Sequence, residues 1–307
     1  MADGSNDGLV DRAPRSIVVG APEVGPLSLG CWRMIEVDSA LAAFDTAIEL
    51  GMNLIDTADV YGLDWGGSGF GENERVLGEV LARRPGARGQ IVVATKGGII
   101  PGVPYDSSDR YLRTACDDSL RRLGVDVIDL YQVHRPDVFT SPRQLAETLA
   151  GLVDSGKVRA VGVSNMTVAQ VDALQAALGE RGASLATNQV ELSVAHLGPL
   201  RDGTVDRVLR DEMTLLAWSP LAGGRLATGD GVRPELVQVL DELAEREGVD
   251  RTTAALAFVL ALPGRPIAIV GTQRPERLRE AARAVDVHLA RADSYRLIEA
   301  SEGVPLP

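Results

Sequence analysis

Three titratable side chains each close a run of apolar residues, and a fourth lies in an adjoining loop. The three are Asp56, Lys96 and His134, and Tyr61 follows Asp56 by five residues. A carboxylate, an ammonium group, an imidazole and a phenol are together suited to proton transfer to a carbonyl oxygen. We therefore take these four residues as the candidate catalytic set.

Each member of this set has a role that follows from its ordinary acidity. Tyrosine is a weak acid at neutral pH, and an adjacent ammonium group lowers its pKa, which Lys96 could do for Tyr61. Asp56 could keep Lys96 charged and oriented, while a neutral His134 could donate a hydrogen bond to the same oxygen. No side chain of the set supplies two electrons, so a redox reaction would need a hydride-carrying cofactor.

Short apolar runs alternate with amphipathic segments over almost the whole chain. The apolar runs are typical of buried parallel strands, expected at 26–30, 52–56, 91–96, 127–133, 158–163, 184–189, 214–217 and 267–270. The amphipathic segments predict helices at 39–50, 72–84, 109–123, 142–155, 167–178 and 204–212. Eight strands alternating with helices predict an α/β protein with a (β/α)8 TIM barrel. In such barrels catalytic residues lie at the carboxyl ends of the strands.

An open doubly wound sheet also alternates strands with helices. It would carry a glycine-rich phosphate turn directly after its first strand. Cys31, Trp32 and Arg33 follow the first predicted strand instead, and residues 66–71 do not match the GxGxxG pattern. The barrel is therefore favoured.

Further segments are expected at both ends of the barrel. Residues 1–15 begin acidic and polar, which predicts a disordered tail, and residues 16–307 are expected to form a single domain. Within that domain, residues 16–25 are expected to form a hairpin that closes the bottom of the barrel. Two helical runs, 233–247 and 251–262, lie between the last two predicted strands, where the barrel needs only one helix. Extra helices are therefore predicted near the C-terminus.

Charge and composition narrow the class of protein. The net charge of −12 disfavours binding to nucleic acid or to anionic membranes. Two distant cysteines and three histidines have no metal-ligand spacing, so no metal site is expected. No signal peptide is recognised, and no apolar stretch approaches the ~20 residues of a membrane span. These observations predict a cytoplasmic protein.

Several motifs resemble those of the aldo-keto reductases. They are Asp56-Thr57-Ala58-Asp59-Val60-Tyr61-Gly62, Thr95-Lys96, Val133-His134-Arg135-Pro136, Val161-Gly162-Val163-Ser164-Asn165, Asn188-Gln189 and Ala217-Trp218-Ser219-Pro220-Leu221. They occur in the family's order, and the resemblance runs from about residue 16 to the C-terminus. The chain is most similar to a group of bacterial members whose natural substrates are poorly defined.

The resemblance implies an NADP(H)-dependent reductase of aldehydes or ketones. Asp56, Tyr61, Lys96 and His134 would form its catalytic tetrad, with Tyr61 as the general acid. By the same resemblance the nicotinamide would be held by Ser164, Asn165, Gln189 and Trp218. The pyrophosphate would be held by Ser219, Leu221, Gly223 and Arg225. The adenosine and its 2′-phosphate would be held by Thr272, Arg274, Arg277 and Glu280.

Aromatic residues in three loops are the candidates for the substrate pocket. Trp32, Trp65 and Tyr105 lie in loops after the first three strands and are expected to wall a pocket for a small carbonyl substrate. The sequence identifies neither that substrate nor any oligomeric partner. A non-catalytic NADP(H)-sensing subunit and a Schiff-base lyase or isomerase using Lys96 remain alternatives.

Overall fold

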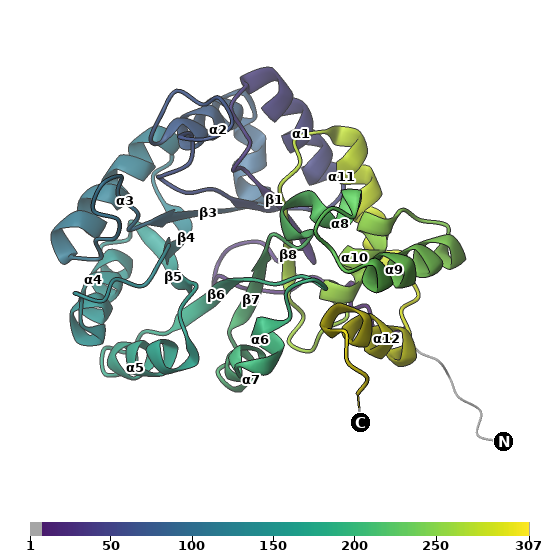
Figure 1. Ribbon diagram of the computed structural model, residues 1–307. Helices are drawn as coiled ribbons and strands as arrows, with labels where there is room; N and C mark the ends of the chain where they lie inside the picture. Colours follow the sequence, from purple (N-terminus) through teal and green to yellow (C-terminus); the bar gives the residue numbers. More distant parts are fainter. Residues whose placement is uncertain (1–7, 307) are drawn as a thin grey trace.

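The computed structural model describes residues 8–306 and shows a closed barrel of eight parallel strands in sequence order (Figure 1). The strands are β1 (Leu27–Gly30), β2 (Leu54–Asp56), β3 (Val92–Gly97), β4 (Ile128–Val133), β5 (Val158–Ser164), β6 (Leu185–Glu191), β7 (Thr214–Trp218) and β8 (Ile267–Val270). Strand β8 pairs with β1, with Ala268 opposite Leu27, and so closes the sheet. The predicted (β/α)8 TIM barrel is confirmed, with every predicted strand present.

Helices follow the strands around the outside of the barrel (Figure 1). The principal ones are α1 (Val37–Glu49), α2 (Glu72–Arg83), α3 (Asp109–Leu123), α4 (Pro142–Asp154), α5 (Val168–Gly179), α7 (Thr204–Arg210), α9 (Pro234–Glu247), α10 (Arg251–Leu260), α11 (Pro275–Ala282) and α12 (Arg291–Glu302). Short helices α6 (Gly198–Arg201) and α8 (Arg225–Thr228) lie in the loops after β6 and β7. Ser141 and Thr167 form capping boxes that begin α4 and α5, since each side chain accepts from the third helical amide.

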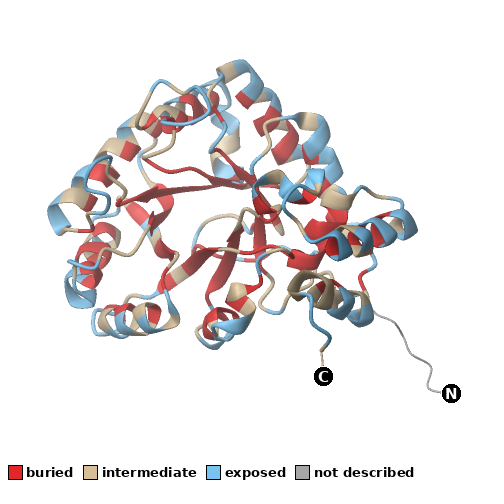
Figure 2. Cartoon of the chain, in the orientation of Figure 1, coloured by how far each residue is buried: buried red, intermediate tan, exposed pale blue. Residues whose placement is uncertain are grey.

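The strands bury two distinct apolar layers because successive side chains point to opposite faces. Val92, Ala94 and Leu130 face the interior of the barrel, whereas Val93 and Tyr131 pack against the surrounding helices. Figure 2 shows the strands and the inward helix faces buried, with the outer helix faces exposed. The polar ends of the strands are therefore anchored by a rigid core.

The segment before β1 closes the bottom of the barrel, as predicted. Arg15 and Val24 exchange both backbone hydrogen bonds, at 2.9 and 2.8 Å, in an isolated antiparallel bridge. Ile17, Val18 and Val24 are buried against the lower interior layer. The hairpin therefore consists of a single bridge around a turn.

The predicted tail over residues 1–15 lies only partly within the described chain. Residues 1–7 lie outside the described part of the chain. Leu9 N donates to Leu289 O at 2.8 Å, and the guanidinium of Arg265 donates to Ala13 O at 2.6 Å. Within the segment predicted as a tail, Leu9 and Ala13 therefore have partners more than 250 residues away in the sequence.

The extra helices predicted near the C-terminus are α9 and α10, between β7 and β8. Arg246 of α9 donates two hydrogen bonds to Asp293 of α12, both at 2.8 Å. These helices gather on one side of the barrel (Figure 1). None of the helices in residues 8–306 is long and apolar enough to cross a membrane.

Candidate active site

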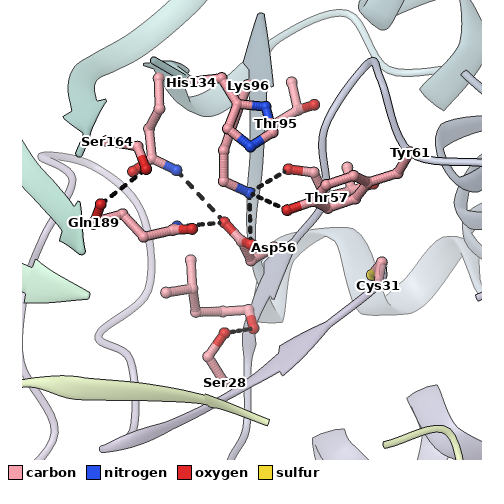
Figure 3. A network of polar contacts seen from close by, with 12 residues as sticks. Ser28, Cys31, Asp56, Thr57, Tyr61, Thr95, Lys96, His134, Ser164 and Gln189 are labelled. Atoms are coloured by element: carbon pink, nitrogen blue, oxygen red, sulfur yellow. Dashed lines mark hydrogen bonds and ion pairs between the residues drawn. The ribbon is translucent and has the colours of Figure 1, made fainter. Parts of the chain in front are cut away.

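The four predicted catalytic residues meet at the carboxyl ends of the strands (Figure 3). Asp56 ends β2, Lys96 lies near the end of β3, and His134 directly follows β4. The loop that carries Tyr61 continues the pairing of β2 with β3, since Thr57 N donates to Ala94 O at 2.9 Å. Strand order thus brings together residues that are up to 78 positions apart in the sequence.

Lys96 lies at the centre of the set. Its ammonium group donates to Asp56 Oδ2 at 2.7 Å and to the carbonyl oxygen of Thr57 at 2.8 Å. A longer contact of 3.4 Å joins it to the hydroxyl of Tyr61. The side chains of Lys96 and Asp56 are 0% and 3% exposed. A buried charge pair of this kind requires several hydrogen bonds to offset its desolvation, and Lys96 has three.

Asp56 is held from the opposite side by two glutamines. Gln189 Nε2 donates to Asp56 Oδ1 at 2.9 Å, and Gln132 Nε2 lies 3.5 Å from the same oxygen. Thr187 Oγ1 in turn donates to Gln132 Oε1 at 3.1 Å. Gln132 was missed in the sequence analysis, although an inward polar residue two positions before His134 in an apolar strand is a usable signal. Residues of β3, β4 and β6 therefore fix the Asp56 carboxylate at the end of β2.

Tyr61 and His134 face the same space above Lys96. Their ring centroids are 5.7 Å apart, with the ring planes at 78°. His134 is 8% exposed, and its Nδ1 atom has no hydrogen-bond partner among the described residues. A carbonyl oxygen between the two rings could accept hydrogen bonds from both.

The pKa values of these groups are set mainly by burial. Burial raises the pKa of Tyr61, while the Lys96 ammonium opposes that shift. The lowering effect of Lys96 was predicted from the sequence, whereas the larger effect of burial was not. Burial also disfavours the Lys96 ammonium, yet Asp56 and Tyr61 together outweigh this, so the pKa of Lys96 is raised. The phenol therefore keeps its proton and the ammonium its charge at neutral pH.

His134 is neutral in this environment. Burial lowers the pKa of His134 well below its usual value, and the positive charges of Lys96 and Arg135 add to the shift. A neutral imidazole has one N–H group that can donate a hydrogen bond. Because it carries no extra proton, it does not replace Tyr61 as the acid.

The residues predicted to hold the nicotinamide form one chain of contacts beside this set. Ser164 Oγ donates to Gln189 O at 2.8 Å, and Asn165 Nδ2 donates to Ser164 Oγ at 2.7 Å. Trp218 Nε1 donates to Asn165 Oδ1 at 3.0 Å, which links β7 to β5. The side-chain amide of Gln189 is engaged by Asp56, so this residue joins the two groups.

The residues predicted for the pyrophosphate lie in the loop after β7. Ser219, Ala222 and Gly223 have positive φ angles of 48°, 51° and 71°, and Arg225 Nε donates to Ala222 O at 3.0 Å. Successive backbone N–H groups in turns of this kind can form a concave site for an anion. Leu221 packs on the core at the start of this loop.

The residues predicted for the adenosine end lie after the neighbouring strand β8. Arg274 and Arg277 are exposed at the start of α11 and make no ion pair with any residue between 8 and 306. Thr272 Oγ1 accepts from Arg274 N at 3.3 Å, and Glu280 is exposed farther along the helix. Two arginines at a helix N-terminus suit a phosphate group. The donor set along β5, β7 and β8 therefore fits NADP(H) in its chemistry.

The predicted pocket aromatics are only partly brought together. Trp32 contacts Trp65 edge to face at 5.5 Å between ring centroids, and it lies 6.5 Å from Tyr61. Tyr105 pairs with Ile99 through an isolated bridge and makes no ring contact with the tryptophans within the described chain. The wall next to Tyr61 is therefore formed by the two tryptophans.

Two arginines at this rim were not predicted. The guanidinium carbon of Arg33 lies 4.0 Å from the centroid of Trp65, and that of Arg135 lies 5.8 Å from the centroid of Trp218. Neither makes an ion pair with a residue that the structure describes. The rim beside the catalytic set thus carries aromatic rings with two guanidinium groups next to them.

Comparisons with known proteins find similar sequences over almost the whole chain. Residues 23–302 match the family described as the aldo/keto reductase family. A 6-dehydroglucose reductase of Novosphingobium aromaticivorans is 45% identical over 289 residues, covering 92% of this chain and 94% of the relative. A 6-dehydroglucose reductase of Agrobacterium fabrum is 32% identical, with 90% and 93% covered. The oxidoreductase YdhF of Escherichia coli is 33% identical, with 95% and 98% covered.

Proposed function

Because this chain belongs to the aldo-keto reductase family, we propose that it reduces an aldehyde or ketone to an alcohol with NADPH. The observation that carries the proposal is the contact of buried Lys96 with both Asp56, at 2.7 Å, and Tyr61, at 3.4 Å. That contact gives a phenol with an available proton and a cation beside it to stabilise the phenolate that remains.

Each residue of the set then has a defined task. NADPH, when bound, supplies the hydride for the carbonyl carbon. Tyr61 donates its proton to the carbonyl oxygen, and Lys96 stabilises the resulting phenolate. Asp56 keeps Lys96 charged, and the neutral His134 donates a hydrogen bond that orients the carbonyl. Ser164, Asn165 and Trp218 would position the nicotinamide beside them.

The alternative functions are less well supported by the site. A Schiff-base mechanism requires a neutral lysine amine, whereas Asp56 favours the charged form of Lys96. An NADP(H)-sensing subunit would have no need of the complete tetrad. The decisive measurement is consumption of NADPH across a panel of carbonyl compounds, with NADH in parallel. Tight NADPH binding without turnover on any of them would favour the sensing subunit.

We propose a sugar aldehyde as the substrate class. Two relatives that this chain matches over nine tenths of its length are named 6-dehydroglucose reductases. Trp32 and Trp65 offer apolar ring faces, and Arg33 and Arg135 offer donors for hydroxyl oxygens. The buried, unbridged thiols of Cys31 and Cys116 suit a reducing compartment, and we propose the cytoplasm.

Replacing Arg135 with leucine is expected to impair hydroxylated substrates selectively. We expect kcat/KM for 6-dehydroglucose or glyceraldehyde to fall roughly tenfold, because a hydrogen bond to a charged group contributes about 1.5–3 kcal/mol. Propanal has no hydroxyl group for Arg135 to bind. Its kcat/KM should therefore change by no more than about twofold. Arg291→Leu, a change at an exposed arginine of α12, is the matched control. Equal losses on all three aldehydes would contradict the proposed contact.

Replacing both Arg274 and Arg277 with alanine is expected to weaken NADPH binding. Loss of two charge-assisted contacts to the 2′-phosphate should raise the Kd for NADPH by about 10- to 100-fold while that for NADH changes little. Quenching of protein fluorescence during cofactor titration measures both constants. Arg279→Ala, on the same helix α11, is the control. An unchanged ratio of the two constants would mean that these arginines do not bind the phosphate.

A further inference from the structure

A second buried polar cluster lies on the outer side of β3, behind the catalytic set. It consists of Asp59, Glu74, Tyr111, Arg122 and Tyr131, and the carboxyl-bearing residues Asp59 and Glu74 are both 0% exposed. Lys96 points into the barrel, whereas its neighbour Thr95 points outward and donates to Glu74 Oε1 at 2.6 Å. One strand therefore contacts both clusters.

Most of this cluster is already paired. Arg122 Nε donates to Glu74 Oε2 at 2.7 Å, and the same guanidinium contacts Ser119 Oγ at 3.3 Å. Asp59 has no such cation. Its Oδ2 atom accepts a long hydrogen bond of 3.4 Å from Tyr111, and its Oδ1 atom has no partner among the described side chains.

Asp59 lies in the loop that carries Tyr61. Its amide donates to Lys96 O at 3.0 Å, and Tyr61 N donates to Ala58 O at 3.2 Å, so the backbone on both sides is fixed. The Tyr131 hydroxyl, also without a partner within residues 8–306, lies on the same side of β3. A Cβ atom on Gly97 would clash with that hydroxyl and lie 3.4 Å from Asp59 Oδ2. The Asp59 carboxyl group and the Tyr131 hydroxyl thus both lie on the side of Gly97 to which a Cβ atom would point.

We propose that Asp59 is a positioning residue for Tyr61: its carboxyl group, buried beside Tyr111 and Tyr131, fixes the loop that places the phenol beside Lys96. This inference rests on the proposed role of Tyr61. The protonated form of Asp59 suits the site, because a carboxylic acid has a proton to donate and needs fewer donors than a carboxylate. Replacing that acid with the neutral amide of asparagine should therefore preserve the loop.

The electrostatic surroundings agree with a protonated Asp59. Burial raises the pKa of Asp59 well above its usual value, the Glu74 carboxylate adds to the shift, and Arg122 opposes it. The titratable groups facing it come from α2, α3 and β4 and are Glu74, Tyr111, Arg122 and Tyr131. Glu74 and Arg122 compensate each other, so no net positive charge is available to ionise Asp59.

The first test compares turnover of Asp59→Ala and Asp59→Asn with that of the wild type. We expect kcat to fall about tenfold or more in the alanine variant, since a small displacement of a catalytic group costs up to about a hundredfold. The asparagine variant should stay within about threefold of the wild type, and Kd for NADPH should not change in either. Asp64→Asn, which makes the same substitution at an exposed site of the same loop, is the control. Full kcat in Asp59→Ala, or equal losses in both variants, would overturn the proposal.

The second test needs no turnover and holds even if Asp59→Ala does not fold. A group whose folded-state pKa is raised loses its contribution to stability as pH rises from the unfolded value towards the folded one. The wild type should therefore lose stability relative to Asp59→Asn above about pH 4. We expect the Tm advantage of Asp59→Asn to grow by about 3 °C or more between pH 5 and pH 8. A constant difference over that range would show an ionised Asp59 and overturn the proposal, whereas failure of the proposed function alone would leave this difference intact.

Discussion

Replacing Tyr61 with phenylalanine should reduce kcat by about 10²- to 10⁴-fold, the contribution typical of a positioned general acid. The substitution removes one hydroxyl group and leaves the ring in contact with Trp32 and His134. Because Tyr61 lies outside the contact chain of Ser164, Asn165 and Trp218, the Kd for NADPH should not change. Single-turnover measurement of NADPH oxidation, together with cofactor titration, separates the two effects.

The matched control for this substitution is Tyr105→Phe. Tyr105 lies in the loop after β3 and is 40% exposed, so the same loss of a hydroxyl group occurs away from Lys96. We expect this variant to keep its kcat within about twofold, since no catalytic proton is removed. If Tyr61→Phe kept most of its activity, the assignment of the general acid would be wrong. Another donor, with His134 as the nearest, would then have to protonate the oxygen.

Strand ends could be predicted from the sequence because their signal is local. Asp56 and Lys96 each end an apolar run that is buried in the barrel. Parallel strands in a closed barrel present all these ends at one rim, so the fold itself implied that the residues meet. The distances could not be predicted, and neither could the net direction of the Tyr61 pKa shift, which depends on how completely the barrel excludes water.

The parts that escaped prediction depend on partners distant in the chain. Glu74 reads as a charged residue on the polar face of a helix, but Arg122 and Thr95 make it a buried one. In the sequence, Gln132 is a polar residue in a strand with no evident role. Its role becomes clear from its contacts with Asp56 and Thr187 in the structure. A one-dimensional pattern records the residue types but not the packing that turns a polar side chain inward.

Replacing Lys96 with methionine should abolish turnover and destabilise the protein at the same time. The variant leaves the Asp56 carboxylate buried without its cation, which costs about 3–5 kcal/mol in comparable buried pairs. The hydrogen bond from Gln189 remains but carries no charge. Urea denaturation monitored by circular dichroism gives the free energy of unfolding, and NADPH oxidation gives the rate.

The double variant Lys96→Met with Asp56→Asn separates the two consequences. It removes both charges while keeping an acceptor oxygen for Gln189, so much of the lost free energy of unfolding should return. Activity should not return, because Tyr61 would protonate the carbonyl with no ammonium to stabilise its phenolate. Recovery of both properties would mean that Lys96 serves only to neutralise Asp56. Recovery of stability alone would show that the buried pair is maintained for its effect on Tyr61, since a neutral pair folds equally well.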